Sequence, residues 1–417
     1  MAHEQRHAVV IGGGVIGAFT AYFLEQTGRK VTIIDKGAFA SGCSHGNCGY
    51  VSPSHVMPLQ RPGQIRNGLK GLFSSQHALR IRPRLSPSFW AWMLKFASRC
   101  NERAMLEAGA ARHALLQSAA ALYREIIDRE KLSVDWQAQG LLFVFRDRHG
   151  FDEYRDADRW LRTNFGVAAR MIEGSDALTA LEPALKPGLA GAWLYEIDAH
   201  LRPDRLMREL QRILLERGVR IIEQCEVKGF GEAGGNARVA HTTHQDIEAD
   251  EFVVCTGAWT PFLNNALGSR IPIEPGKGYS ITMPRPTICP RHSMILEECH
   301  VGITPFADGY RVGSTMEFAG YDTTLNRTRL DYLRKGAAQY LHEPAAEPVE
   351  EEWYGWRPMT WDDNPYIDRA PRFPNVWVAA GHNMLGLSMG PATGKLIAEM
   401  IEGRAPHVDA GPYRIGR

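Results

Sequence analysis

A glycine-rich turn near the start of the chain constrains the fold more than any other feature. Residues 8–24 read AVVIGGGVIGAFTAYFL, an uncharged run that contains the pattern Gly12-x-Gly14-x-x-Gly17. A membrane span needs about 20 apolar residues, and no small-residue cleavage site follows, as a signal peptide would require. The segment therefore predicts the first strand, turn and helix of a soluble, nucleotide-binding fold.

The spacing of the elements around this turn predicts a bound dinucleotide. We expect a strand over 8–11, a helix from Val15, and a second strand over 31–34 that ends at Asp35. Glycines permit the tight turn, the close approach of a pyrophosphate and close packing of the helix, whose N-terminal N–H groups favour an anion. A carboxylate after the second strand suits the hydroxyl pair of a ribose. The alternative is a plain glycine turn with a surface aspartate.

Composition excludes several classes of protein. The 417 residues are enough for two domains. Lysine plus arginine total 48 against 47 for aspartate plus glutamate, which argues against a nucleic-acid binder. The seven cysteines include no CxxC pair, so we expect no disulfide framework, no zinc or iron–sulfur site, no other metal, and a cytoplasmic location.

The segment after the second strand carries a resemblance to a known family. Residues 40–49 read ASGCSHGNCG and are followed by Ser52-Pro53, so small residues and glycines allow the backbone to lie along a long cofactor. This stretch resembles the corresponding loop of the D-amino-acid oxidase superfamily of FAD enzymes. The nearest branch is that of the bacterial D-amino-acid dehydrogenases, which includes D-hydroxyproline dehydrogenases.

Three later segments extend the resemblance over nearly the whole chain. They are the tract 218–227, the turn 256–259 after a strand over 252–255, and the run 381–391 after a strand over 376–380, where we expect Pro391 in the first turn of a helix. The resemblance implies non-covalent FAD, because the cysteine-linked branch carries its cysteine near position 357, where this chain has none. The FAD-binding residues implied are Gly12, Gly14, Val15, Ile16, Gly17, Asp35, Lys36, Ser44, His45, Asn47, Gly49, Val51, Val227, Thr256, Gly257, Trp259, Gly381, His382, Met384, Leu385, Gly386, Leu387 and Ser388.

The expected fold is α/β with α+β character, in which a Rossmann-like FAD-binding domain is interleaved with a mixed-sheet substrate-binding domain that also has helices. We assign residues 1–59, 201–264 and 361–417 to the first domain, and residues 60–200 and 265–360 to the second. Helical spacing of alanine and leucine predicts a long helix over 102–131. The residues after about Gly403 are expected to form a loose tail.

The element Gly355-Trp356-Arg357-Pro358 supplies the main catalytic candidate. It resembles a family element whose arginine pairs with the carboxylate of the substrate, a geometry that a planar guanidinium fork suits. A structural salt bridge is the alternative. Tyr50, Tyr279 and His55 are further catalytic candidates by position, although for each a structural role is the simpler interpretation.

The resemblance implies oxidative deamination of D-amino acids. The α-hydrogen leaves as hydride to flavin N5, and the imino acid hydrolyses to a 2-oxo acid and ammonia. The alternatives are a dehydrogenase of D-proline or D-hydroxyproline, a 2-hydroxy-acid oxidase, and a non-catalytic flavoprotein subunit. Neither the handedness nor the side-chain preference of the substrate follows from individual residues.

The electrons are expected to pass to a respiratory acceptor, such as quinone or another redox protein. Residues 79–99 read LRIRPRLSPSFWAWMLKFASR, an aromatic segment with basic flanks. Such a segment suits peripheral contact with the inner face of a bacterial cytoplasmic membrane. A helix packed against the second domain is the alternative that we favour, because aromatic stripes usually belong to a core.

Overall fold

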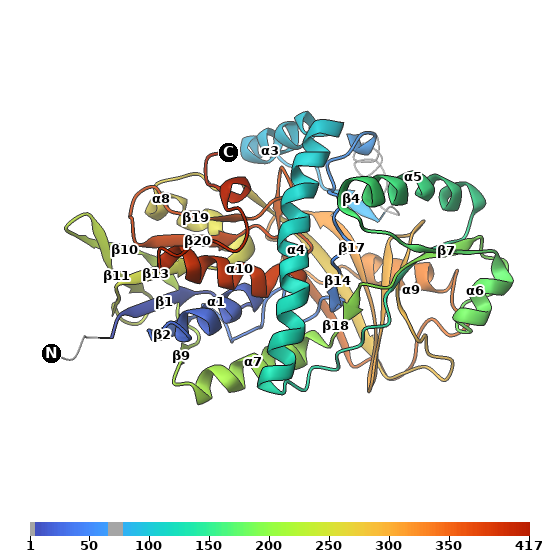
Figure 1. Cartoon of the computed structure of the whole chain (residues 1–417), viewed down its shortest axis with the longest axis horizontal. Coiled ribbons are helices and arrows are strands. Elements are labelled where there is room, and N and C mark those ends of the chain that lie inside the picture. Colours follow the sequence, from blue (N-terminus) through green and yellow to red (C-terminus); the bar gives the residue numbers. More distant parts are fainter. Residues whose placement is uncertain (1–4, 66–77) are drawn as a thin grey trace.

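Two sheets joined by a long helix organise the molecule (Figure 1). The computed structural model describes residues 5–65 and 78–417. Within these residues, the first sheet has the strand order β19-β20-β13-β1-β2-β9, with β19 antiparallel to β20 and the other neighbours parallel. Its strands are β1 (His7–Ile11), β2 (Lys30–Ile34), β9 (Arg220–Ile222), β13 (Glu251–Val254), β19 (Tyr366–Arg369) and β20 (Val376–Ala380).

The predicted glycine turn joins β1 to helix α1 (Val15–Glu25). Gly12 has φ +111°, a conformation that side chains rarely adopt. A Cβ at Gly17 would lie 1.8 Å from the carbonyl oxygen of Gly12, so helix and turn approach each other too closely for any side chain there. The strand, the turn and the helix start predicted from the sequence are thus confirmed.

The second sheet is mixed and lies on the other side of the molecule. In the described part of the chain its path runs β18-β14-β17-β16-β15-β5-β7-β6, with β4 paired to β17. The strands are β4 (Leu79–Ile81), β5 (Leu141–Phe145), β6 (Arg170–Glu173), β7 (Gly191–Tyr195), β14 (Ile273–Met283), β15 (Ser293–Leu296), β16 (Val301–Phe306), β17 (Gly309–Phe318) and β18 (Glu351–Thr360).

Smaller elements complete the described chain. Two short sheets are formed by β3 (Tyr50–Val51) with β8 (Ala199–His200), and by β10 (Val227–Ala233), β11 (Asn236–Thr242) and β12 (Ile247–Glu248). The helices include α5 (Arg148–Phe165), α6 (Ser175–Leu181), α7 (Pro203–Glu216), α8 (Asn264–Leu267), α9 (Arg327–Ala337) and the 3-10 turns η1 (Gly257–Leu263) and η2 (Gly411–Tyr413).

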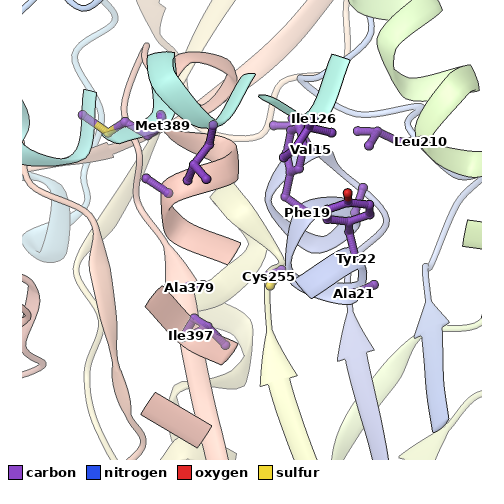
Figure 2. Packing of buried hydrophobic residues seen from close by; sticks show 14 of the residues in the cluster. Val15, Phe19, Ala21, Tyr22, Ile126, Leu210, Cys255, Ala379, Met389 and Ile397 are labelled. Atoms are coloured by element: carbon purple, nitrogen blue, oxygen red, sulfur yellow. The ribbon is translucent and has the colours of Figure 1, made fainter. Parts of the chain in front are cut away.

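The long predicted helix is α4 (Glu102–Glu130), and it runs between the two halves of the molecule in Figure 1. Its buried face joins one core with α1, α7 and α10 (Gly386–Ile401). Figure 2 shows part of this core, where Phe19 and Tyr22 of α1 lie near Ile126 of α4 and Leu210 of α7. The domain boundaries stay a prediction. The strands of the first sheet lie within residues 1–59, 201–264 and 361–417, and those of the second within residues 60–200 and 265–360.

Helix α3 (Pro87–Ser98) has both a packed and an exposed face. Phe89 and Trp92 are buried against Phe318, which confirms the favoured interpretation for these two rings. Trp90 and Leu94, on the same helix, are exposed. Within the described residues, no helix combines the length and the hydrophobicity needed to cross a bilayer.

Two expectations about the C-terminal region are wrong. Helix α10 begins at Gly386, so Pro391 lies inside the helix rather than in its first turn. Proline has no N–H to donate to the carbonyl four residues earlier, and the hydroxyl of Tyr123 donates to that carbonyl, of Leu387, at 2.7 Å instead.

The chain end is also fixed rather than loose. Tyr413 is fully buried and its hydroxyl donates to the carbonyl oxygen of Ala111 at 2.8 Å. The guanidinium of Arg417 pairs with Asp362 and stacks over the ring of Tyr366. The residues after Gly403 are largely polar, so the sequence did not indicate that Tyr413 and Arg417 would be fixed by contacts with distant parts of the chain.

Candidate active site

The predicted cofactor residues gather at one edge of the first sheet. The glycine turn, Asp35, Thr256 and Gly381 each follow the carboxyl end of a parallel strand: β1, β2, β13 and β20, respectively. Carboxyl ends of parallel strands share an edge, and ligands of open α/β sheets bind there. We call this edge, with the loop 40–49 that covers it, the cofactor edge.

The start of α1 offers backbone donors to an anion. Gly14 is the N-cap residue and has no side chain of its own to cap the helix, and no acidic residue lies in the first turn. Ser44 crosses from the loop and accepts a hydrogen bond from the N–H of Val15 at 2.9 Å. The other N–H groups of this helix terminus and its dipole therefore favour a phosphate at Gly14.

Asp35 fixes the neighbouring turn at the end of β2. Its carboxylate accepts hydrogen bonds from the N–H groups of Gly13 at 2.6 Å and Gly37 at 2.8 Å. The N–H of Cys225 donates to the carbonyl oxygen of Asp35. This bond brings the start of β10, at Val227, close to Asp35. On the same side, the ammonium of Lys36 lies 3.8 Å from the ring centre of Trp259.

The loop 40–49 is held by its own hydrogen bonds. The side chain of Asn47 donates to the carbonyl oxygen of Ser44 at 3.1 Å and accepts from the N–H of Gly49 at 2.8 Å. His45 bonds to the carboxylate of Glu351 at 2.8 Å, which raises the pKa of its imidazole. The ring of Trp353 lies directly against Gly46, where a Cβ would meet it at 2.2 Å.

A second helix terminus points to the same edge. The N-cap residue of α10 is Leu385, again without a side-chain cap. His382 is buried, bonds to Thr393 at 3.0 Å, and has its pKa lowered by burial to about 3. The hydroxyl of Ser388 donates to the carbonyl oxygen of Tyr50, the residue before Val51, at 2.8 Å. Met384 is exposed beside these residues.

The cofactor edge fits an FAD molecule. It offers a glycine turn that admits no side chain, a carboxylate after β2, and two helix N-termini whose N-cap residues have no capping side chain, as a dinucleotide with a flavin ring requires. The two helix termini would hold the pyrophosphate and stabilise negative charge on the reduced flavin. The individual contacts to the cofactor stay predictions.

Arg357 lies on β18, close to the loop 40–49. The Nη1 of its guanidinium donates to the carbonyl oxygen of Thr315 at 2.6 Å, and among the described residues no carboxylate forms a salt bridge with it. Burial lowers its pKa, although the neighbouring thiols of Cys43 and Cys48 oppose the shift. A largely enclosed cation without an anionic partner is costly, so the arrangement is suited to receive a carboxylate from a ligand.

A strained bulge next to Arg357 could not be read from the sequence. Ser314 and Thr315 in β17 have φ +96° and +55°, values that residues other than glycine rarely adopt. The pairing of β17 with β14 shifts register here, between Lys277 and Tyr279. The bulge points the carbonyl of Thr315 at Arg357 and leaves the hydroxyl of Thr315 buried without a partner among the described atoms. Such bulges are common beside active sites.

Tyr279 lies on β14, but its hydroxyl is already engaged. It donates to the carboxylate of Glu317 at 2.7 Å, and Glu317 is fully buried. Burial and this bond raise the pKa of Tyr279 well above its ordinary value. Burial also opposes the charge on Glu317, yet the bonds from Tyr279 and Arg82 keep the pKa of that carboxyl below its usual range.

Tyr50 and His55 flank the loop on the second-domain side. The hydroxyl of Tyr50 lies 2.9 and 3.0 Å from the carbonyl oxygens of Met294 and Ile303. The ring of His55 lies against Phe143, and its Nδ1 has no partner among the described residues. Burial, with the charge of Arg112, lowers the pKa of His55 to about 4, so the imidazole is neutral.

A buried carboxyl that sequence reasoning missed lies nearby. Asp198 precedes β8, and the N–H and hydroxyl of Ser54 bond to its two oxygens at 3.0 and 2.5 Å. Burial raises its pKa to about 7, against these two bonds. No spacing pattern marked Asp198, because only the packing of β8 against the loop after β3 removes it from water.

Comparison with known proteins adds three findings. The family model described as FAD dependent oxidoreductase matches residues 7–400. The chain is 31% identical to the D-amino acid dehydrogenase of Granulibacter bethesdensis, over 98% of this chain and 99% of that protein, and 32% identical to that of Chromohalobacter salexigens, over 96% and 97%. Glycine oxidase from Geobacillus kaustophilus shares the fold with a TM-score of 0.79 at 21% identity, covering 99% of both chains.

Proposed function

Because the chain belongs to the FAD dependent oxidoreductase family, we propose that it is a dehydrogenase that oxidises D-amino acids and passes the electrons to an acceptor other than oxygen. FAD is its cofactor. The relatives described above, D-amino acid dehydrogenases matched over nearly their full length, support the substrate class. The observation that carries the proposal is Arg357, a largely enclosed guanidinium without a carboxylate partner beside the cofactor edge.

In this proposal Arg357 binds the substrate carboxylate and thereby fixes the position of Cα. Bound FAD supplies the acceptor for the hydride that leaves Cα. The contribution of the protein is mainly orientation, which alone lowers a barrier by several kcal/mol, up to about 10. The carbonyl of Thr315 accepts a hydrogen bond from the guanidinium and holds it in place. The imino acid then hydrolyses in water to a 2-oxo acid and ammonia.

No protein base is required if the substrate binds with a neutral amine. His55 and His382 have pKa values lowered to about 4 and 3, so both are neutral but lack the basicity to hold a proton near pH 7. The hydroxyls of Tyr50 and Tyr279 are engaged within the fold. We therefore propose that these four residues shape the pocket.

An anaerobic screen of flavin bleaching tests the proposed function. The purified holoenzyme is mixed with paired D- and L-amino acids, cis-4-hydroxy-D-proline and 2-hydroxy acids. Bleaching by D-amino acids, with release of ammonia, supports the proposal. Bleaching only by the cyclic imino acid or by hydroxy acids assigns one of the other activities, and bleaching by none contradicts a catalytic role.

We further propose that the flavin is held without a covalent bond. Flavin fluorescence that leaves the chain on acid denaturation agrees with this, whereas fluorescence that stays with the chain on a denaturing gel contradicts it.

Peripheral contact with a membrane is the proposed setting for electron transfer. Trp90 and Leu94 on α3 are exposed, and so is Leu85, which precedes the helix. The basic residues Lys95 and Arg99 are close to them in the sequence. Exposed apolar residues with basic neighbours suit the interface of an anionic bilayer, such as the inner face of a bacterial cytoplasmic membrane. Sedimentation with vesicles that contain anionic lipid supports the contact. Equal sedimentation of the Leu94→Glu variant contradicts this use of α3.

A further inference from the structure

A buried arginine binds the backbone of the loop 40–49 that covers the cofactor edge. Arg311 lies on β17, and only 1% of its surface is exposed. Its Nη1 donates to the carbonyl oxygens of His45 at 3.3 Å and of Asn47 at 2.8 Å. Its Nε donates to the hydroxyl of Thr282, on the neighbouring strand β14, at 2.9 Å. The guanidinium is therefore held by the second sheet and in turn holds the loop.

Two buried hydroxyls of the same sheet bind the other carbonyls of this segment. Ser280 on β14 donates to the carbonyl oxygen of Gly46 at 2.7 Å. Thr304 on β16 donates to the carbonyl oxygen of Cys48, also at 2.7 Å. The four consecutive carbonyls of residues 45–48 are thus all turned toward the second sheet. We call these two residues and the buried arginine the carbonyl clamp.

The carbonyl clamp determines where the N–H groups of the loop point. The peptide bonds of the loop are trans, and in a trans peptide the carbonyl of one residue and the N–H of the next point in opposite directions. The N–H groups of Gly46, Asn47 and Cys48 therefore point away from the second sheet. No described residue accepts a hydrogen bond from these three donors.

The three donors face the cofactor edge. Ser44, which precedes them, accepts a hydrogen bond from the N–H of Val15 in the first turn of α1. The carbonyl of Tyr50, which follows them, accepts one from the hydroxyl of Ser388 near the start of α10. The loop therefore runs between the two helix termini at which we place the pyrophosphate and the flavin, with the second sheet behind it.

One end of the loop lies next to the expected substrate. The sulfur of Cys48 lies 2.8 Å from the place that a Cβ on Gly313 would take, and it is an electrostatic neighbour of Arg357. The reacting part of FAD has to meet a substrate that Arg357 holds. The N–H groups of Asn47 and Cys48 are therefore assigned to the flavin ring rather than to the pyrophosphate.

We propose that Arg311 is a positioning residue that, together with Ser280 and Thr304, directs the N–H groups of the loop at the flavin ring. Reduction adds two electrons to the ring, and N–H donors bind an acceptor more strongly as its negative charge grows. The carbonyl clamp therefore favours the reduced cofactor and raises the reduction potential of the flavin. The inference rests on the proposed function, through bound FAD and Arg357, but its test needs no amino acid.

An equilibrium with a redox dye tests the carbonyl clamp without substrate. The holoenzyme is reduced stepwise under anaerobic conditions beside a dye of known, similar potential, and absorbance gives the reduced fraction of each. Arg311→Met keeps the length of the side chain but has no donors. At a given state of the dye, we expect its ratio of reduced to oxidised flavin to be about 10-fold below that of the wild type, or about 30 mV for a two-electron couple.

Milder variants keep the test decisive if Arg311→Met does not fold. Thr304→Val and Ser280→Ala each remove one hydroxyl of the carbonyl clamp, and each should lower the same ratio about 3-fold. Thr304→Ser keeps the hydroxyl and should retain the ratio of the wild type. Ser293→Ala is the matched control, because this buried hydroxyl of β15 donates to the carbonyl oxygen of Gly140 at 3.2 Å, outside the loop. Its ratio should not change.

The other outcomes overturn the assignment. An unchanged ratio in Arg311→Met and in both hydroxyl variants, whatever their Tm, would leave the carbonyl clamp with a structural role alone. Faster release of FAD on dilution at an unchanged ratio would place the N–H groups on the pyrophosphate. An equal fall of the ratio in Ser293→Ala would reveal a general loosening of the sheet. Wild-type enzyme that no amino acid bleaches would instead count against the proposed function.

Discussion

The turn between β1 and α1 and the bulge of β17 both hold backbone at positive φ, but by different means. In the turn, Gly12 adopts φ +111° without a steric penalty. In the bulge, Ser314 and Thr315 adopt φ +96° and +55°, each at a cost of about 1–3 kcal/mol. The β17 strand pairs with β14 on one side and β16 on the other, and these ladders hold the strained residues in place.

The difference between the glycine turn and the bulge of β17 reflects the different contacts that a cofactor and a substrate require. The glycine turn presents backbone N–H groups, so glycines that remove side chains suffice. The region around β14, β17 and β18 presents the guanidinium of Arg357, which is held by the carbonyl of Thr315. The predictions below probe these two regions in order of expected effect.

The largest effect is expected in the glycine turn. Gly17→Ala places a Cβ 1.8 Å from the carbonyl oxygen of Gly12, so turn or helix must move. We expect loss of bound FAD or of soluble protein, measured as the ratio of flavin absorbance to protein absorbance. Gly229→Ala, with no atom within 4 Å of the new Cβ, is the control and should keep full flavin content. Full content in Gly17→Ala as well would contradict the role of the turn.

The buried carboxyl of Asp198 predicts a dependence of stability on pH. Its folded pKa of about 7 lies above the ordinary 3.8, so between these values the folded state binds the proton more tightly than the unfolded state. Its contribution is fully present below pH 3.8 and is lost as the pH rises to 7, by up to about 1.4 kcal/mol per pH unit.

The Asp198→Asn variant mimics the neutral acid and should remove this contribution. We expect its Tm to exceed that of the wild type by little at pH 4 and by much more at pH 8. Equal Tm differences at both pH values would show that the carboxyl does not titrate in this range.

Removing the hydroxyl of Tyr279 separates a structural from a catalytic role. Tyr279→Phe leaves the buried carboxylate of Glu317 without one donor, which costs about 1–3 kcal/mol of stability. We expect a lower Tm, while the rate of anaerobic bleaching stays within about 3-fold of the wild type. A bleaching rate at least about 100-fold lower with an unchanged Tm would make the hydroxyl catalytic.

The smallest effect is expected at the bulge. Ser314→Gly relieves the strain at φ +96° and raises Tm by about 1 °C. The looser bulge holds the carbonyl of Thr315, and hence Arg357, less firmly, so the KM for the amino acid should rise a few-fold. A lower Tm with an unchanged KM would show that the bulge does not position Arg357.

The sequence predicted the parts of the fold that local chemistry determines. Apolar runs and glycines located β1, β2 and α1, and the spacing of alanine and leucine located α4. The start of α10 was predicted too late in the chain. Pro391 is tolerated inside the helix because the hydroxyl of Tyr123, on α4, donates to the carbonyl of Leu387 that the proline leaves without a partner. The last residues were taken for a tail, because the sites that bind Tyr413 and Arg417 lie far away in the chain.

The candidate site divides in the same way. Arg357 and the residues of the cofactor edge could be proposed as site residues because they lie in motifs that are visible in a single sequence. The bulge at Ser314 and Thr315 contains no glycine to mark it, and the shifted pKa of Asp198 arises from burial alone. Features of this kind depend on residues that meet only after folding.

A comparison of an amino acid with its amide tests the central claim most directly. Anaerobic bleaching is measured for D-alanine and D-alaninamide, with the wild type and with Arg357→Ala, all at equal flavin content. If Arg357 binds the carboxylate, the wild type should prefer the acid in kcat/KM by about 100-fold or more, and the variant should lose most of this preference. An unchanged preference in Arg357→Ala would contradict the account.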